Sequence, residues 1–177
     1  MFLANRKFDD SYLVALLPEA LSDNIISWGY DYIPCGDLYE DRYDPSFGRE
    51  KDIHVTLLGP LDEQNISFIS SAVHAENPIT CVLGKIDLFK SNSKYDVIKI
   101  EVVNQTILNL NQRLSKNICN TPRFPLYIPH VTIAYVKKGL GDQYVNNTYF
   151  EGQQFNIIEL QLSHKSGQKH IIKLGQP

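Results

Sequence analysis

One short sequence occurs twice in the chain, and this repeat constrains the fold more than any other feature. HVTLLG begins at His54, and HVTIAY begins at His130. Successive side chains of a β-strand point to opposite faces, so the histidine and the threonine of each copy share a face. The apolar residues between and after them then face the core. The repeat therefore predicts two strands whose histidine–threonine faces form the two walls of one groove.

The length and composition indicate an ordinary folded domain. A chain of 177 residues can bury a sizeable core, since chains of about 150 residues bury roughly 70% of their unfolded surface. No apolar run approaches the roughly 20 residues of a transmembrane helix, and the N-terminus turns charged too early for a secretory signal. The three cysteines lack a CxxC spacing, which favours free thiols in a reducing compartment. We expect a cytoplasmic protein with one domain, residues 1–177, made of two similar lobes.

The charge balance bears on the class of partner. The net charge is −3 and the isoelectric point is about 5.9. Proteins that grip long nucleic acids through phosphates usually present a basic surface, because counterion release supplies much of the affinity. The acidic balance disfavours long nucleic acid as a partner, and it favours a small ligand with few phosphates. No membrane partner is expected.

Hydrophobic periodicity predicts further strands and three helices. Beside the two HVT strands, strands are expected at residues 11–17, 80–89, 95–103, 155–163 and 169–174. Helices are expected from Pro18 to Gly29, around residues 66–73, and along the apolar stripe from Val103 to Ile118, with Asn104 as N-cap. Each HVT strand thus follows a strand and a helix, which indicates a weak internal duplication. We predict an α+β fold with two antiparallel sheets around a central groove and helices outside.

Residues 31–52 show neither strand nor helix periodicity. A loop of this length within a compact domain is usually either functional or disordered. It runs directly into the first HVT strand, so it is expected near the mouth of the groove. Its aromatic and basic side chains could cover a ligand, or they could belong to a solvated surface loop: Tyr39, Arg42, Tyr43, Phe47, Arg49 and Lys51.

The repeated residues suit acid–base chemistry on a phosphodiester. An unperturbed imidazole has a pKa of about 6.5, so near neutrality one histidine can accept a proton while the other donates one. Phosphodiester cleavage needs both steps, and His54 and His130 are the candidates. The hydroxyls of Thr56 and Thr132 could donate hydrogen bonds to the non-bridging phosphoryl oxygens. This scheme needs no metal and no cofactor.

Other chemistries find less support in the sequence. Each HxT copy supplies one metal ligand, whereas a catalytic zinc usually takes three, and HxH and HExxH spacings are absent. No GxSxG occurs, and no cysteine stands beside a histidine, so covalent catalysis lacks a candidate nucleophile. A single HVT would have little significance, but two copies that both enter strands are harder to dismiss. His74, His164 and His170 have no such context and are interpreted as surface residues.

Paired H-x-T motifs on strands, in a chain of this length, resemble those of the 2H phosphoesterase superfamily. LVALLP before a helix resembles the opening of that family, and IIELQLSHKSG resembles its closing strand. The superfamily includes 2′-5′ RNA ligase-like proteins, 2′,3′-cyclic nucleotide phosphodiesterases and phage enzymes that destroy cyclic oligonucleotide signals. The resemblance implies a bilobed α+β fold with a central groove and metal-independent cleavage.

The resemblance also assigns roles. It implies that His54 and His130 are the catalytic pair and that Thr56 and Thr132 bind the phosphate. Ligase-like members often have an arginine shortly after the second motif, whereas Tyr135 and its neighbours stand here. The resemblance therefore implies phosphodiesterase activity more than ligase activity.

Residues outside the motifs would bind the rest of the substrate. Aromatic rings that could stack on nucleobases, each worth about 1–3 kcal/mol, are Tyr12, Tyr43, Phe47 and Phe124. The nearest cations for phosphate contacts are Arg49 and Arg123. Counting in twos from His130 places Tyr135 on the core face, so it is not expected to touch substrate.

The leading hypothesis is a 2H phosphodiesterase that acts on a small nucleotide. Its substrate would be a cyclic oligonucleotide, a 2′,3′-cyclic phosphate or a 2′-5′ linkage; in a viral setting the first would make it an anti-CBASS immune evasion enzyme. One alternative is a module on the same fold that sequesters a nucleotide without cleaving it. Another is an RNA end-processing phosphodiesterase.

Overall fold

The computed structural model describes residues 11–61, 66–74, 76–117, 126–164 and 166–175. Its helices are α1 (Glu19–Tyr32), α2 (Ile66–His74) and α3 (Gln105–Asn117), with short 3-10 helices η1 (Cys35–Asp37) and η3 (Asp142–Tyr144). Its strands are β1 (Ser11–Leu16), β2 (His54–Leu61), β3 (Ile79–Phe89), β4 (Tyr95–Val103), β5 (His130–Lys137), β6 (Gln154–Ile157), β7 (Glu159–Ser163) and β8 (Lys169–Lys173). None of the described helices has the length and apolar character needed to cross a membrane.

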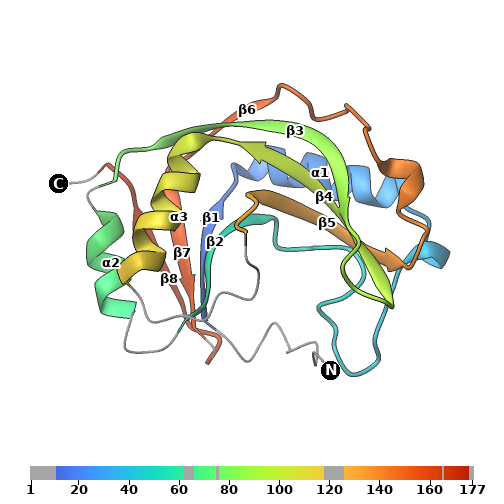
Figure 1. Ribbon diagram of the computed structural model, residues 1–177, viewed down its shortest axis with the longest axis horizontal. Helices are drawn as coiled ribbons and strands as arrows, with labels where there is room; N and C mark the ends of the chain where they lie inside the picture. Colours follow the sequence, from blue (N-terminus) through green and yellow to red (C-terminus); the bar gives the residue numbers. More distant parts are fainter. Residues whose placement is uncertain (1–10, 62–65, 75, 118–125, 165, 176–177) are drawn as a thin grey trace.

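The strands form one antiparallel sheet that is bent into a half-barrel (Figure 1). Its order is β6-β3-β4-β5-β2-β1-β7-β8, so the two HVT strands, β2 and β5, are the central neighbours. They pair where Val55 meets Val131. The predicted α+β class is confirmed, and the two expected sheets are the two halves of this single sheet. The predicted hairpin of residues 80–89 and 95–103 is present as β3 and β4.

The strand expected at residues 155–163 is divided between the two halves of the sheet. β6 pairs with β3 at one edge, whereas β7 pairs with β1 and β8 in the other half. Only Ile158 separates them, and it is exposed. A connection of one residue requires the two ends of the sheet to approach each other. This short link therefore helps to explain the strong bend visible in Figure 1.

Each of the two central strands is covered by a helix that comes from the opposite half of the sheet. α1, which follows β1, packs on β5, and α3, which follows β4, packs on β2. The prediction that Gly29 ends the first helix is wrong, because α1 continues to Tyr32. A Cβ atom on Gly29 would lie 3.2 Å from Cγ2 of Ile133, so glycine permits the close approach of α1 to β5. Gly29 serves packing here and not termination.

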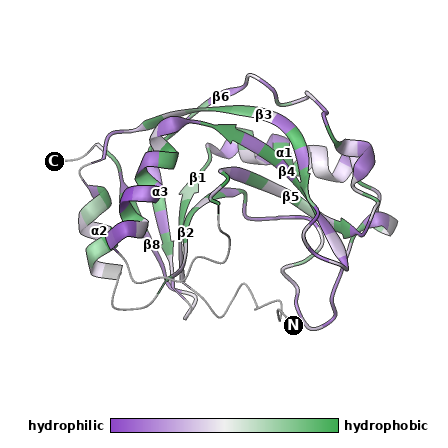
Figure 2. Ribbon diagram, in the orientation of Figure 1, coloured by the Kyte–Doolittle hydropathy of each residue, from purple (hydrophilic) through white to green (hydrophobic). Residues whose placement is uncertain are grey.

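The third helix forms over most of its predicted range, but Val103 does not belong to its apolar stripe, because it is the exposed last residue of β4; Ile118 lies outside the described residues. The side chain of Asn104 accepts a hydrogen bond from the N–H of Ile107 at 2.8 Å, which satisfies a free donor of the first turn. Asn111 on α3 donates to the carbonyl of Leu57 on β2 at 2.7 Å. In Figure 2 α3 alternates hydrophobic and hydrophilic residues, and β4 beside it carries a long hydrophobic stretch. The apolar stripe of α3 thus faces the sheet, with Ile107, Leu110 and Leu114 buried.

Buried acids with high pKa values make the fold sensitive to alkali. Burial raises the pKa of the Cys81 thiol from 9.0 to about 12, and it also raises the pKa values of the Tyr127 and Tyr135 phenols. Above about pH 9 the unfolded chain loses these protons first, so it binds fewer protons than the folded chain and the free energy of unfolding falls as pH rises. Urea titrations between about pH 7 and about pH 11 should show this fall. Cys81→Ala should make it shallower near its onset, and a free energy that does not fall would contradict the expectation.

Candidate active site

The two HVT motifs meet side by side at the centre of the sheet. Because Val55 pairs with Val131 in antiparallel register, the next positions place His54 opposite Thr132 and Thr56 opposite His130. Opposed residues on one face have Cβ atoms about 4.5–5.5 Å apart. Both valines are fully buried, whereas the other four side chains are partly exposed. The two His–Thr pairs therefore form one compact patch on the face away from the valines, which we call the histidine face.

The two histidine rings are held in the same way. Nδ1 of His54 lies 2.5 Å from the carbonyl oxygen of Asp52, and Nδ1 of His130 lies 2.7 Å from that of Ile128. A carbonyl can only accept, so each Nδ1 carries the proton and donates it. In the neutral rings the proton-accepting atom is then Nε2. The same contact, two residues upstream in each motif, prepares both rings to exchange protons through Nε2.

A bulge interrupts each central strand directly after the threonine. One step along β1, from Val14 to Leu13, corresponds to two steps along β2, from Thr56 to Leu58. One step along β4, from Lys99 to Ile98, likewise corresponds to two along β5, from Thr132 to Ala134. An extra residue in a strand reverses the alternation of faces beyond it. The two halves of the site are thus equivalent down to the position of the bulge.

The bulge in β5 overturns the expected direction of Tyr135. Tyr135 pairs with Val97, and Val97 lies two residues from Lys99, which pairs with Thr132. Side chains at these positions share the histidine face, so Tyr135 does as well. Counting in twos from His130 failed because it assumed an uninterrupted strand. Tyr135 lies among other rings, which cover part of it and leave part of it exposed, and this partial burial raises the pKa of its hydroxyl.

A buried charge that the sequence reasoning missed lies beside the second motif. Lys99 pairs with Thr132 across the sheet, and Glu101 pairs with His130. Lys99 is only 2% exposed; its Nζ lies 3.0 Å from Oδ2 of Asp87 and 3.9 Å from Oε1 of Glu101. The alternating polar residues of the predicted strand 95–103 were the available signal. They show the same period of two as the HVT motifs.

The ring of Phe89 connects this charge to His130. Nζ of Lys99 lies 4.9 Å from the ring centroid of Phe89, whose ring meets the His130 ring edge to face at 4.8 Å. Burial acts to raise the pKa of Asp87, but hydrogen bonds from the Leu88 N–H and from Lys99 outweigh it, so the pKa lies below its usual value. Asp87 is therefore a carboxylate near neutral pH. The flank of His130 thus carries the Lys99–Asp87 ion pair, with the Phe89 ring packed against the histidine.

The flank of His54 has a different composition. Across β1, Leu16 pairs with His54 and Val14 pairs with Thr56. On the next strand, Gln161 pairs with Val14 and donates a hydrogen bond to Ser163 at 2.8 Å. The two halves therefore share a backbone plan, but the strand beside His130 contributes Lys99 and Glu101, whereas the strand beside His54 contributes Val14 and Leu16.

The backbone beside Thr56 is held by a residue upstream of β5. The hydroxyl of Tyr127 donates a hydrogen bond to the carbonyl of Thr56 at 2.9 Å. This contact crosses from one half of the sheet to the other, next to the Val55–Val131 pair. It helps to set the spacing of the two motifs, and nothing in the sequence pattern indicated it.

The loop of residues 31–52 lies along the edge of β5. Tyr39 donates its N–H to the carbonyl of Tyr135 at 3.0 Å, Tyr135 donates to Gly48 at 2.8 Å, and Glu50 donates to Ile133 at 2.8 Å. The loop thus takes the place of β2 where β2 diverges from β5. Phe47 reaches the histidine face through this pairing, with its ring 5.1 Å from that of Tyr135.

Arg49, a predicted phosphate contact, is engaged elsewhere. Its Nε donates to the carbonyl of Gly29 at 3.0 Å, and its terminal nitrogen donates to that of Ile33. Its guanidinium also lies 4.6 Å from the ring centroid of Tyr30. Arg49 therefore binds the C-terminal end of α1, on the helix side of β5, and the structure places it away from the histidine face.

The remaining predicted contacts differ in position. Tyr12 lies on β1 over Gly59, on the histidine face. Tyr43 is 67% exposed in a turn, with the Arg42 guanidinium 4.3 Å from its ring centroid. Arg123 and Phe124 lie outside the described residues.

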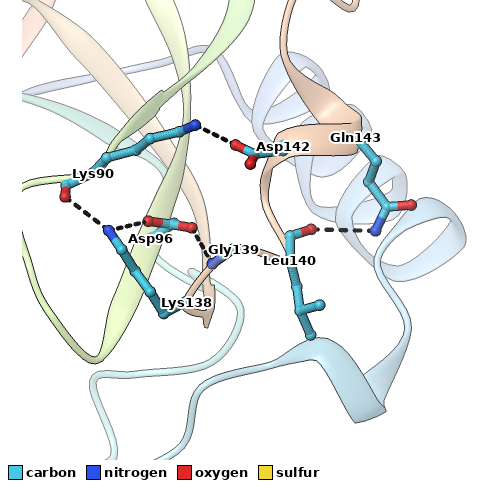
Figure 3. Close-up of polar contacts among 7 residues, drawn as sticks. All are labelled: Lys90, Asp96, Lys138, Gly139, Leu140, Asp142 and Gln143. Carbon is cyan, nitrogen blue, oxygen red and sulfur yellow. Dashed lines mark hydrogen bonds and ion pairs between the residues drawn. The ribbon is translucent and has the colours of Figure 1, made fainter.

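The far end of β5 is fixed by a buried carboxylate (Figure 3). Asp96 is fully buried and accepts hydrogen bonds from Nζ of Lys138 at 2.8 Å and from the N–H of Gly139 at 2.7 Å. Lys138 also donates to the carbonyl of Lys90, and Lys90 pairs with Asp142. The β3–β4 turn is thus tied to the end of β5. In the described part of the chain, no three His, Cys, Asp or Glu side chains gather closely enough to hold a metal.

Comparisons with known proteins support the fold and the family. A model of the 2′-5′ RNA ligase superfamily matches residues 34–168. TT0787 of Thermus thermophilus superposes with a TM-score of 0.64 at 14% identity, over 94% of this chain and 100% of that one. Escherichia coli LigT complexed with 3′-AMP gives 0.60 at 16% identity, over 93% and 94%. Kluyveromyces marxianus Usb1 with uridine monophosphate gives 0.62 at 11% identity, over 94% and 99%.

The structural likenesses show the fold alone, because the sequence identities are too low to carry a function. A comparison with curated proteins finds no match. The family match rests on the sequence itself and spans both HVT motifs and most of the chain. The chain therefore belongs to the 2′-5′ RNA ligase superfamily, a group of 2H phosphoesterases.

Proposed function

We propose that this protein is a metal-independent phosphodiesterase that cleaves a small nucleotide by general acid–base catalysis. Members of its superfamily are phosphodiesterases. The observation that best supports the proposal is the patch on the histidine face, where each histidine lies opposite the threonine of the other motif. That arrangement offers two proton-exchanging groups and two hydroxyl donors around one point.

The patch can perform the two proton transfers that the reaction requires. Nε2 of one histidine removes a proton from the attacking hydroxyl or water, and Nε2 of the other protonates the leaving oxygen. The hydroxyls of Thr56 and Thr132 donate hydrogen bonds to the non-bridging oxygens, where negative charge gathers. The histidines exchange roles when the reaction runs in the opposite direction, because the acid of one direction is the base of the other.

The bound ligands of related folds support a small substrate. The LigT structure contains 3′-AMP, and the Usb1 structure contains uridine monophosphate. The net charge of −3 points the same way, since it offers little general attraction for a long polyanion. A cyclic oligonucleotide, a 2′,3′-cyclic phosphate or a 2′-5′ linkage each fits this description. A viral protein that cleaved the first would act against a nucleotide-based host defence.

The direct test is an activity screen in the presence of EDTA. Purified protein is incubated with cyclic di- and trinucleotides, 2′-5′-linked dinucleotides and 2′,3′-cyclic mononucleotides, and the products are separated by chromatography. We expect turnover of at least one substrate without added metal. If none of these substrates is cleaved, the proposal is wrong. Recovery of an unchanged nucleotide from a stable complex would instead indicate a sequestering module.

Removing the charge of Lys99 should weaken substrate use. Lys99→Met keeps the apolar stem but leaves Asp87 and Glu101 uncompensated beside the site of an anionic phosphate. Two unit charges about 8 Å apart at an effective dielectric constant of about 20 interact by about 2 kcal/mol, so kcat/KM should fall by roughly 30-fold. The measurement is steady-state kinetics with the substrate found in the screen, with a melting curve to check folding.

The double variant Lys99→Met/Asp87→Asn is the matched control. It removes one carboxylate together with the lysine, so it should recover much of the lost kcat/KM. A single variant with unchanged kinetics would show that the field of Lys99 does not reach the substrate.

A further inference from the structure

Beyond the four-residue patch, two aromatic sites lie at equivalent positions on the histidine face. The paired bulges place the fifth residue after each histidine on this face; these residues are Gly59 on β2 and Tyr135 on β5. On β2 the ring comes from the neighbouring strand, because a Cβ atom on Gly59 would lie only 2.2 Å from Cδ1 of Tyr12. The ring of Tyr12 thus lies directly over the glycine. One half-site uses a tyrosine at that position, and the other uses a glycine with a tyrosine above it.

The ring on the β5 side is part of a closely packed aromatic cluster. The ring centroid of Phe47 lies 5.1 Å from the centroids of Tyr95 and of Tyr135. The ring centroid of Tyr39 lies 5.0 Å from those of Phe47 and of Tyr95. These rings come from three separate segments: the loop, the start of β4 and β5. The hydrogen bonds of the adjoining residue Asp96 hold β4 against the end of β5 (Figure 3). Tyr135 is therefore presented by a firmly held backbone.

The antiparallel pairing puts the two rings on opposite sides of the patch. β2 and β5 run in opposite directions from the Val55–Val131 pair, so Gly59 and Tyr135 lie toward opposite ends of it. Each is three residues beyond its threonine, which is about 10 Å along a strand. A phosphate held between the threonines would thus have an aromatic ring on each side.

We propose that the site takes a phosphodiester that joins two nucleosides, with one base on the Tyr12 ring and the other on the Tyr135 cluster. This inference rests on the proposed function, and it deepens it by naming the substrate class. Base–aromatic stacking accepts every base, so two such platforms select for the number of bases more than for their identity. A 2′,3′-cyclic mononucleotide has one base and can occupy one platform only. Cyclic or linear dinucleotides and longer oligonucleotides can occupy both.

The test compares ligands with one base and with two on a protein that cannot cleave them. In the His54→Ala/His130→Ala variant, isothermal titration measures binding of cyclic di-AMP, 2′-5′-linked diadenylate and 2′,3′-cyclic AMP. We expect at least one two-base ligand to bind at least about tenfold more tightly than the one-base ligand. Adding Tyr12→Leu or Tyr135→Leu should each weaken that ligand by roughly 10- to 100-fold, and either change should remove most of its advantage.

Matched variants separate stacking from folding. Tyr12→Phe and Tyr135→Phe keep the rings and should keep the preference, whereas Gly59→Ala should disturb it by displacing the Tyr12 ring. Tyr30 is an exposed tyrosine on α1, so Tyr30→Leu should leave the affinity for two-base ligands unchanged. If Tyr135→Leu fails to fold, Tyr12→Leu and Gly59→Ala still test the proposal from the other half of the site.

The outcomes distinguish this inference from the proposed function. No preference for either two-base ligand, or a preference that survives loss of either ring, overturns the inference. If the wild-type protein cleaves 2′,3′-cyclic AMP as efficiently as both two-base ligands and the tyrosine changes leave this unaltered, the inference fails while the proposed function stands. If two-base ligands bind as expected but no diester is cleaved, the proposed function fails and the binding class stands.

Discussion

Alanine at position 54 or 130 is expected to lower kcat/KM for phosphodiester cleavage by roughly 10²- to 10⁴-fold, the usual contribution of a positioned general acid or base. The reason is geometric: each ring is oriented by its Nδ1 contact, so that Nε2 exchanges the proton. The double variant His54→Ala/His130→Ala should have a kcat/KM little below that of the less active single variant, because the effects of groups that act as a unit are not additive. Steady-state kinetics on purified variants measures all three.

The dependence of kcat/KM on pH should show which histidine acts as the general base and which acts as the general acid. Wild-type protein should show a bell-shaped profile, and each single variant should lose one limb of the bell. The limb lost with His54→Ala or His130→Ala tells which ring acts as the base for the substrate in use. His74→Ala, on the exposed end of α2, is the matched control and should keep the wild-type profile. Wild-type rates in both His54→Ala and His130→Ala would contradict the acid–base scheme.

Valine in place of Thr56 or Thr132 is expected to lower kcat by roughly 10²- to 10³-fold, the loss seen when one donor to a developing oxyanion is removed. Valine has nearly the shape of threonine and suits a strand, so folding should change little. Both threonines are partly exposed on the histidine face, and each lies opposite a histidine. The expected loss is therefore chemical and not structural.

Serine variants provide the control for this prediction. Thr56→Ser and Thr132→Ser keep the hydroxyl and should retain most of the activity. Melting temperatures within the wild-type range would show that the valine variants are folded. Full activity of both valine variants would remove the threonines from the proposed mechanism.

Much of the fold followed from local sequence patterns. The period of two in HVT placed the valines inside and the histidines and threonines together on the other face, as the structure has them. The stripe of α3 and the Asn104 cap are equally local, because both depend on residues within one or two turns. Local patterns also predicted the β3–β4 hairpin. Gly29 misled because a glycine at a close packing contact has the same letter as one that ends a helix.

The parts of the site that the sequence did not show depend on pairing between distant segments. Lys99 and Glu101 join the histidine face only because β4 pairs with β5 in a particular register. Arg49 leaves that face because its strand-like segment presents it to the carbonyl groups at the end of α1. Neither outcome can be read from neighbouring letters.

The sequence by itself determined that the chain has two strands with matching His–Thr faces, since the alternation of side chains is a local property of any strand. Only the tertiary structure decided that these strands are neighbours, with each histidine opposite the other motif's threonine. It also decided that a bulge after each threonine brings Gly59 and Tyr135 to the same face. The physical reason is that an extra residue in one strand is defined only by the partner strand that fails to match it, and that partner lies far away in sequence.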